Sequence, residues 1–213
     1  MKVRRPPALV LCYHRVRTEE DPLNLSVHPK RFREQMERLW SLADVVPATE
    51  IRDRGRRPRV AITFDDGYAD NLEIAAPILA DVGAPATFFF TSSAIDGTGE
   101  FWWELLDHLV LEVESTTPYL KLDFSGRPVR VDVASDADRR RTHALLNEHL
   151  ITCDPDEQQR ILADIQLQTG GRTDPCEAHR KITEQQVREL IAHEGFELGG
   201  HTISHPVLAR LDR

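Results

Sequence analysis

The feature that most constrains the fold of this chain is the alternation of short apolar runs with helical patterns. Apolar runs of strand length cover residues 8–16, 59–64 and 86–91. A helix is expected to begin at Pro29, after the first run, and another covers 69–83, after the second. Strands that alternate with helices join through right-handed crossovers, which place the strands parallel to one another. We therefore expect an α/β fold around a mainly parallel sheet.

The spacing of apolar residues within these two helices predicts their buried faces. The helix from Pro29 should bury a face made of Phe32, Met36, Leu39 and Trp40. The second helix should be interrupted at Pro77 and should end at Gly83. Its inward face should consist of Leu72, Ala75, Ala76 and Leu79.

Residues from about 95 to 170 depart from this alternation. The segment around Ser125 and Gly126 alternates like a hairpin that turns at these two residues. Two amphipathic helices are expected over 136–169. We interpret about 95–170 as an inserted helical and hairpin segment within a single domain that spans 1–213.

Composition excludes several classes of protein. The chain has 40% apolar and 29% charged residues, an ordinary balance for a soluble domain. Its formal net charge of −8 argues against a nucleic-acid binder, because neutralising phosphates requires a basic face. No apolar run is long enough to cross a bilayer, and the run that begins at Ala8 is too short for a signal-peptide core. Cys12, Cys153 and Cys176 are odd in number and lack CxxC spacing, so they indicate neither a disulfide framework nor a cysteine-based zinc site, and a cytoplasmic location is favoured. We interpret these cysteines as small buried side chains.

Polar residues gather where expected strands end. Asp65 and Asp66 follow the run 59–64, and His14 lies near the end of the first run. The sequence HTISHP follows a short strand expected over 196–200, which comes after a capping-box pattern. Because the carboxyl ends of parallel strands share one edge of a sheet, we expect these polar residues to meet there.

The residue types in these clusters indicate a metal site. His201 and His205 are spaced i, i+4, so one helical turn ending before Pro206 would present both imidazoles to one ion. Alone, this pair also fits an ordinary helix surface, and Asp65 with Asp66 also fits a solvated turn. Together, two imidazoles and one carboxylate make a three-ligand site that leaves positions for water, as catalytic zinc sites do. The other carboxylate can then serve as general base.

The order of these motifs resembles a known family. TFDDG at 63–67, followed far downstream by HTISHP at 201–206, is similar to the first two signature motifs of the polysaccharide deacetylases, carbohydrate esterase family four, also called the NodB-homology domain. YHRV near the start, GAPATFFFT and FWWE add to the similarity. The resemblance implies a distorted (β/α) barrel, usually of seven strands, and metal-dependent removal of acetyl groups from N-acetylated sugars.

The resemblance also implies roles for individual residues. Asp65 would be the general base, and Asp66, His201 and His205 would bind one divalent metal ion, with zinc expected and cobalt, nickel or iron as alternatives. A backbone N–H at or near Tyr68 would assist the oxyanion. The substrate would be an N-acetylated oligosaccharide or polysaccharide precursor.

Three further residues have weaker functional interpretations. His14 could lie near the metal or the substrate, or it could be a packed histidine. Trp102 and Trp103 could stack on a sugar ring, or they could simply pack in and over a hydrophobic core. The remaining histidines of the helical segments receive no role in a site.

The family's later motifs have no counterpart in the sequence. Arg213 ends the sequence eight residues after His205, whereas the family places a base-orienting arginine, an aromatic floor and a leucine-histidine motif with the general acid further downstream. The expected barrel is therefore incomplete at its C-terminal end, as in a fragment or a truncated product.

Three functions fit these observations. The first is deacetylation of an N-acetylated glycan, and the second is hydrolysis of a non-sugar amide by the same mechanism. The third is an inactive metal-binding or carbohydrate-binding relic. Retention of Asp65 argues against the relic, because a structural metal site needs no second acid beside its ligands.

Overall fold

The computed structural model describes residues 7–19, 25–53, 55–114, 117–172 and 174–210. Contacts divide the chain into two compact units. The first, here called the sheet unit, comprises Met1–Thr98 and Arg180–His205, and the second, the helical unit, comprises Gly99–His179 and Pro206–Arg213. The expectation of a single domain with an insertion stays a prediction.

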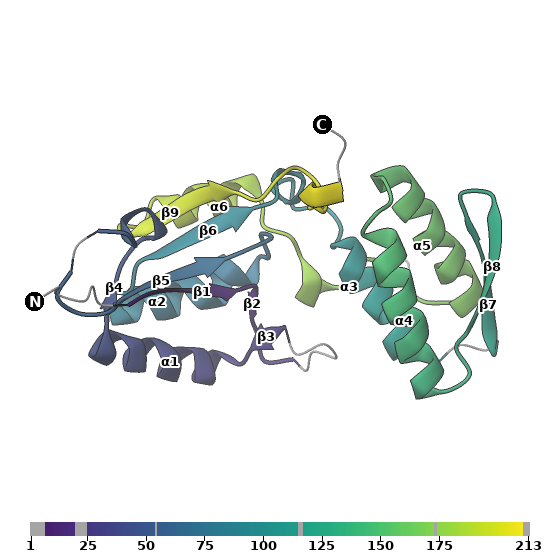
Figure 1. The fold of residues 1–213 in the computed structure, drawn as a ribbon, viewed down its shortest axis with the longest axis horizontal. Helices are drawn as coiled ribbons and strands as arrows, with labels where there is room; N and C mark the ends of the chain where they lie inside the picture. Colours follow the sequence, from purple (N-terminus) through teal and green to yellow (C-terminus); the bar gives the residue numbers. More distant parts are fainter. Residues whose placement is uncertain (1–6, 20–24, 54, 115–116, 173, 211–213) are drawn as a thin grey trace, which may run out of the picture. The chain divides into compact units, whose positions relative to one another are not determined.

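The sheet unit contains a parallel sheet with the strand order β1-β5-β6-β9 (Figure 1). These strands are β1 (Ala8–Tyr13), β5 (Arg59–Phe64), β6 (Ala86–Phe90) and β9 (Phe196–Gly200). The short β4 (Asp44–Val45) pairs with the start of β5, whereas β6 pairs with its end. The expected α/β fold with a mainly parallel sheet is confirmed, and within the described residues this sheet is open rather than closed into a barrel.

The first apolar run does not form one continuous strand. After β1, the chain breaks at His14 and continues as β2 (Arg15–Val16), which pairs with β3 (Ser26–Val27) in a separate small sheet. The break redirects the chain at the carboxyl end of β1.

The helix α1 (Pro29–Leu42) begins as expected, with proline in its first turn and the His28 side chain accepting a hydrogen bond from the backbone N–H of Lys30. Phe32 and Met36 are fully buried, but Trp40 is 48% exposed, so its assignment to the buried face is wrong. Each step of four residues rotates a helix by about 40°, and two steps carry Trp40 off the stripe that Phe32 starts.

The second helix has the interruption and the stop that the sequence predicts. A π-helical turn over Asn71–Ala75 precedes α2 (Ala76–Val82), and Pro77 lies in the first turn of α2. Gly83 caps the helix in the left-handed region at φ 69°.

A row of phenylalanine rings runs through the core of the sheet unit. Phe64 of β5 stacks on Phe88 of β6 with ring centroids 5.0 Å apart, and Phe88 meets Phe196 of β9 edge to face at 5.4 Å. Phe32 of α1 packs edge to face on Phe64 at 5.8 Å. These ring contacts pack α1, β5, β6 and β9 against one another, and the polar residues follow the carboxyl ends of these strands.

The helical unit begins with α3 (Trp102–Asp107) and a π-helical turn, His108–Glu112. The antiparallel hairpin of β7 (Tyr119–Phe124) and β8 (Arg127–Asp132) turns at Ser125 and Gly126, as predicted. Two helices follow, α4 (Asp136–Leu150) and α5 (Pro155–Thr169). Together with the hairpin, their buried faces enclose a separate core of leucine, valine and isoleucine side chains.

The chain returns to the sheet unit through α6 (Glu184–Ile191), which the predicted capping box of Thr183 and Gln186 starts. An isolated antiparallel bridge joins Asp96 to Thr183, so the chain leaves and re-enters this unit at neighbouring points. A Cβ atom on Gly97 would lie only 2.5 Å from the Thr183 side chain, which explains why this position holds a residue without a side chain.

Short 3₁₀ segments also occur in the described residues, at Ala48–Glu50, Ser92–Ala94, Glu177–His179 and Leu208–Arg210. No helix in the described part of the chain has the length and apolar character needed to cross a membrane.

Candidate metal centre

The candidate site lies where parallel strands of the sheet unit end. Asp65 and Asp66 directly follow β5, His201 directly follows β9, and His14 directly follows β1. The parallel topology therefore brings together polar residues from opposite ends of the sequence, as expected.

The turn after β5 fixes the direction of the Asp66 side chain. Asp66 has a φ of 73° and Gly67 a φ of 106°, both in the left-handed region that non-glycine residues rarely adopt. Two backbone hydrogen bonds hold this turn: Asp65 N–H donates to Tyr13 O at 3.0 Å, and Thr91 N–H donates to Asp66 O at 3.0 Å. The neighbouring strand ends thus impose the conformation of Asp66.

The two histidines do not lie on a helical turn, so that part of the prediction is wrong. Thr202 and His205 both have left-handed backbones, with φ of 69° and 55°. Proline at position 206 disfavours the right-handed helical region for His205, and Thr202 Oγ1 accepts the His205 N–H at 3.0 Å. The loop is anchored elsewhere, because Ser92 N–H donates to Thr202 O at 3.0 Å and His201 N–H donates to Phe90 O at 2.9 Å.

The loop nevertheless brings both imidazoles to Asp66. Oδ1 of Asp66 lies 3.7 Å from Nε2 of His201 and 3.5 Å from Nε2 of His205. The two imidazole centroids are 4.8 Å apart. These three residues each offer a ligand atom, and the three atoms lie within 4.8 Å of one another. We call this set the Asp66 cluster.

The Asp66 cluster fits a divalent cation. Asp66 is only 4% exposed, and its Oδ1 atom is buried without a hydrogen-bond partner among the described residues. A buried carboxylate oxygen of this kind is costly unless a proton or a cation compensates it. One carboxylate with two imidazoles is also a donor set that zinc sites use.

Burial sets the protonation of the cluster. It raises the pKa of the Asp66 carboxyl, and the neighbouring imidazoles of His14, His205 and His201 oppose this shift. Burial likewise lowers the pKa of His205, although the charge of Asp66 acts in the opposite direction. A lowered pKa keeps the His205 imidazole neutral, which is the form that binds a metal.

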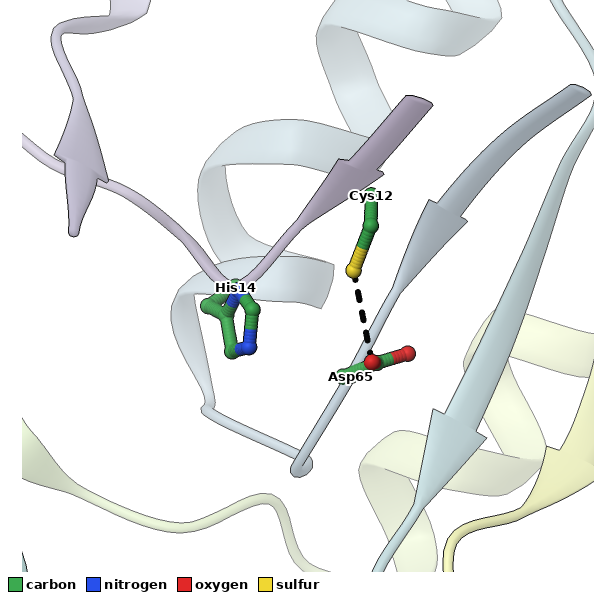
Figure 2. A group of neighbouring side chains, drawn as sticks. All are labelled: Cys12, His14 and Asp65. Carbon is green, nitrogen blue, oxygen red and sulfur yellow. Dashed lines mark hydrogen bonds between the residues drawn. The ribbon is translucent and has the colours of Figure 1, made fainter. Parts of the chain in front are cut away.

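A second set of donors lies beside Asp65. Cys12 Sγ, His14 and Asp65 each offer a ligand atom, and these three atoms lie within 4.8 Å of one another. Figure 2 shows the three side chains directed toward one another from the ends of β1 and β5. The Cys12 thiol donates a hydrogen bond to Asp65 Oδ2 at 3.3 Å. We call this set the Cys12 cluster.

Cys12 is the member of the site region that sequence reasoning missed. The interpretation of the three cysteines as buried is wrong, since Cys12 is exposed and Cys153 and Cys176 are partly exposed. Although part of the Cys12 surface is open to solvent, neighbouring groups desolvate its thiol. This desolvation is the largest cause, and the hydrogen bond to Asp65 the next, of a rise in the pKa of the Cys12 thiol to about 11. The signal was the spacing: Cys12 and His14 lie two residues apart, and alternate residues of an extended chain face the same side.

Tyr68 is buried, with 2% of its surface exposed, and the Arg15 guanidinium lies 4.3 Å from the centroid of its ring. Arg15 is also buried and pairs with Asp70 at 3.0 Å. This pair supports the segment that follows the two aspartates. The role predicted for the backbone N–H near Tyr68 stays a prediction.

Trp102 and Trp103 belong to the helical unit and are both partly exposed. Trp103 stacks on Phe101 with centroids 4.5 Å apart, and it meets Trp102 edge to face at 5.5 Å. In the same unit, His143 pairs with Asp107 at 2.6 Å, so this histidine takes part in a buried polar contact.

Comparison with known proteins identifies relatives of this chain. Residues 52–120 match the family model described as polysaccharide deacetylase. A Bacillus subtilis (strain 168) protein with the provisional name polysaccharide deacetylase YxkH is 29% identical over 135 residues, which cover 58% of this chain and 47% of that protein. The chain therefore spans about half the length of this relative.

Solved structures with detectable similarity to this chain include PplD and IcaB. The Streptococcus pyogenes deacetylase PplD, in complex with acetate, is 25% identical and aligns over 44% of this chain and 45% of its own, with a TM-score of 0.37. IcaB from Ammonifex degensii is 18% identical and aligns over 97% of this chain and 90% of its own, with a TM-score of 0.41.

Proposed function

We propose that this chain, whose residues 52–120 match the polysaccharide deacetylase family model, hydrolyses the N-acetyl amide of a carbohydrate. The products would be acetate and a free amine on the sugar. A divalent metal ion, with Zn²⁺ as the expected ion, would be held by Asp66, His201 and His205.

The observation that carries this proposal is the buried Oδ1 atom of Asp66. It faces Nε2 of His201 and of His205 at 3.7 and 3.5 Å and has no hydrogen-bond partner in the described part of the chain. One carboxylate oxygen and two imidazole nitrogens that lie within 4.8 Å of one another form a donor set that suits a divalent cation.

The residues at and beside the Asp66 cluster have separate roles in the proposed hydrolysis. When bound, the ion supplies Lewis-acid polarisation of the amide carbonyl. Asp65 accepts a proton from the attacking water, a role that its carboxylate can serve because it belongs to a different set of contacts from Asp66. The Cys12 thiol, which donates to Asp65 Oδ2, holds that carboxylate in place. A backbone N–H at or near Tyr68 donates to the developing oxyanion.

The test combines metal analysis with an acetate assay. The metal-depleted chain is titrated with Zn²⁺ and then incubated with an N-acetylglucosamine oligomer or with a simple non-sugar acetamide. We expect acetate release from the oligomer only after metal addition. Asp65→Asn should bind the metal at the Asp66 cluster without releasing acetate, whereas His201→Ala should lose that metal and the activity.

The possible outcomes separate the parts of the proposal. Release from the simple acetamide but not from the oligomer would replace the carbohydrate by a non-sugar amide. Metal bound at the Asp66 cluster with no release from either compound would overturn the activity and leave a binding protein. Equal metal loss in Asp65→Asn and His201→Ala would show that the roles of Asp65 and Asp66 are misassigned.

A further inference from the structure

The Cys12 cluster combines three kinds of metal ligand outside the Asp66 cluster. It offers a sulfur from Cys12, a nitrogen from His14 and an oxygen from Asp65, all within 4.8 Å of one another (Figure 2). Tetrahedral zinc holds such ligand atoms about 3.3–3.8 Å apart, given metal–ligand bonds of about 2.0–2.3 Å. The Cys12 thiol already lies 3.3 Å from Asp65 Oδ2, so small side-chain movements would complete the arrangement.

The backbone beneath the Cys12 cluster is well fixed. β1 and β5 pair in parallel register through Cys12 opposite Thr63 and Tyr13 opposite Phe64. The N–H of Asp65 donates to Tyr13 O at 3.0 Å and extends this pairing past the end of β5. Cys12 therefore projects from a paired strand, and His14 and Asp65 directly follow paired strands. The backbone of His14 is also held, because its carbonyl oxygen accepts a hydrogen bond from Asn71 Nδ2 at 2.9 Å. Such fixed positions favour a precise metal site.

The cluster is also accessible. Cys12 is exposed, and His14 and Asp65 are partly exposed. An ion can therefore enter from solvent and keep a water molecule as its fourth ligand.

We propose that Cys12, His14 and Asp65 form a second cation site that prefers thiophilic divalent ions such as Zn²⁺. On the proposed function, its occupation is inhibitory, because an Asp65 oxygen bound to metal no longer accepts a proton from water. The neighbouring Asp66 cluster should fill first, because its Asp66 oxygen is buried without a hydrogen-bond partner among the described residues, whereas Asp65 is partly exposed and already accepts a hydrogen bond from Cys12. Once it is filled, repulsion between two dications bound through consecutive residues weakens binding at the second site. Excess zinc, rather than the first equivalent, should therefore inhibit.

Cobalt titration of the metal-depleted chain tests the site without relying on activity. Co²⁺ bound by a cysteine thiolate gives a sulfur-to-metal charge-transfer band in the near ultraviolet. We expect two equivalents bound, with the band appearing with the second. Cys12→Ser should bind one equivalent and lose the band. Cys153→Ser is the matched control, because Cys153 lies in the helical unit, and it should retain both features.

His201→Ala separates the two sites. It should lose one equivalent and keep the thiolate band, because the Cys12 cluster does not include His201. A wild-type chain without the band, or a band that persists in Cys12→Ser, would overturn the second site.

Zinc inhibition is measured relative to the uninhibited rate of each variant. We expect excess Zn²⁺ to lower acetate release at least tenfold in the wild type and less than twofold in Cys12→Ser. Equal inhibition of both proteins would overturn the inhibitory role. If the band appears but no condition releases acetate, the second site stands and the proposed function fails.

Discussion

Asp65 and Asp66 are consecutive in the chain, but their carboxylates join different sets of donors. Asp65 Oδ2 accepts a hydrogen bond from the Cys12 thiol at 3.3 Å, whereas Asp66 Oδ1 lies 3.5 Å from Nε2 of His205. The separation follows from the backbone, because Asp66 adopts a left-handed conformation immediately after the extended β5. Substitutions at these two positions should therefore have distinct effects.

Asp66→Asn should abolish stabilisation by metal at the Asp66 cluster. A ligand present at one hundred times its Kd adds about 2.7 kcal/mol to the free energy of unfolding, provided that it binds only the native state. Cys12→Ser is the background for both proteins, so that only the Asp66 cluster is tested. Thermal unfolding with and without Zn²⁺ measures the difference, and an unchanged shift in Asp66→Asn would remove this residue from the ligand set.

In the absence of metal, Asp66→Asn should make the stability of the protein less dependent on pH. Burial raises the pKa of Asp66 above its ordinary value of 3.8. The residue therefore contributes stability below that ordinary pKa and loses the contribution as pH rises through the raised pKa. Metal-free Asp66→Asn should thus lose less stability than the wild type between acidic and neutral pH, as denaturant midpoints would reveal.

Gly199→Ala should weaken both the fold and the site. A Cβ atom at Gly199 would lie 2.3 Å from a ring carbon of Phe89, so either the Phe89 ring or β9 must shift. We expect a loss of about 1–3 kcal/mol in stability, typical of overpacking, and weaker metal binding because His201 follows β9 directly. Gly200→Ala is the control, since its Cβ would meet no atom within 4 Å. Similar metal affinities for both variants would contradict the link between β9 and the site.

Arg15→Ala should be strongly destabilising. Arg15 and Asp70 form a buried ion pair at 3.0 Å, and removal of one partner from such a pair costs about 3–5 kcal/mol. Arg33→Ala provides the comparison, because Arg33 pairs with Asp81 at 2.8 Å on the surface and exposed pairs contribute only about 0–1 kcal/mol. Denaturant unfolding of both variants measures the difference, and equal losses would contradict a structural role for the buried pair.

The Cys12 thiol should react slowly with iodoacetamide despite its exposure. With a pKa of about 11, only about one thousandth of it is thiolate at pH 8, against about one tenth at the ordinary pKa of 9.0. The rate should rise steeply up to about pH 11. Asp65→Asn should accelerate alkylation at pH 8, because it removes the negative charge of Asp65 that helps to raise the pKa. Mass spectrometry of peptides containing Cys12 follows the reaction, and a rate that levels off near pH 9 would contradict the raised pKa.

Local patterns were sufficient to predict most of the secondary structure. The turn at Ser125 and Gly126, the stop at Gly83 and the capping box of Thr183 and Gln186 depend on side chains within a few residues of one another. Trp40 shows where periodicity is less reliable, because steps of four residues gradually rotate a side chain off the buried stripe of a helix, and Trp40 is 48% exposed.

The conformation of the site was less predictable because it depends on distant contacts. The spacing of His201 and His205 suggested a helical turn, but the loop is shaped by hydrogen bonds to Phe90 and Ser92, far earlier in the sequence. The proximity of Asp66 to the two histidines followed from parallel topology alone. Their catalytic and metal-binding roles, and that of His14, stay predictions.

The bridge between Asp96 and Thr183 makes the sheet unit a candidate for fragment complementation. The chain leaves this unit at Thr98, two residues after Asp96, and returns at Arg180, three residues before Thr183. A cut between these positions would place Asp65 and Asp66 on one polypeptide and His201 and His205 on another. Neither fragment alone would carry the three donors of the Asp66 cluster. Metal uptake would then report the reassembly of β9 onto β6.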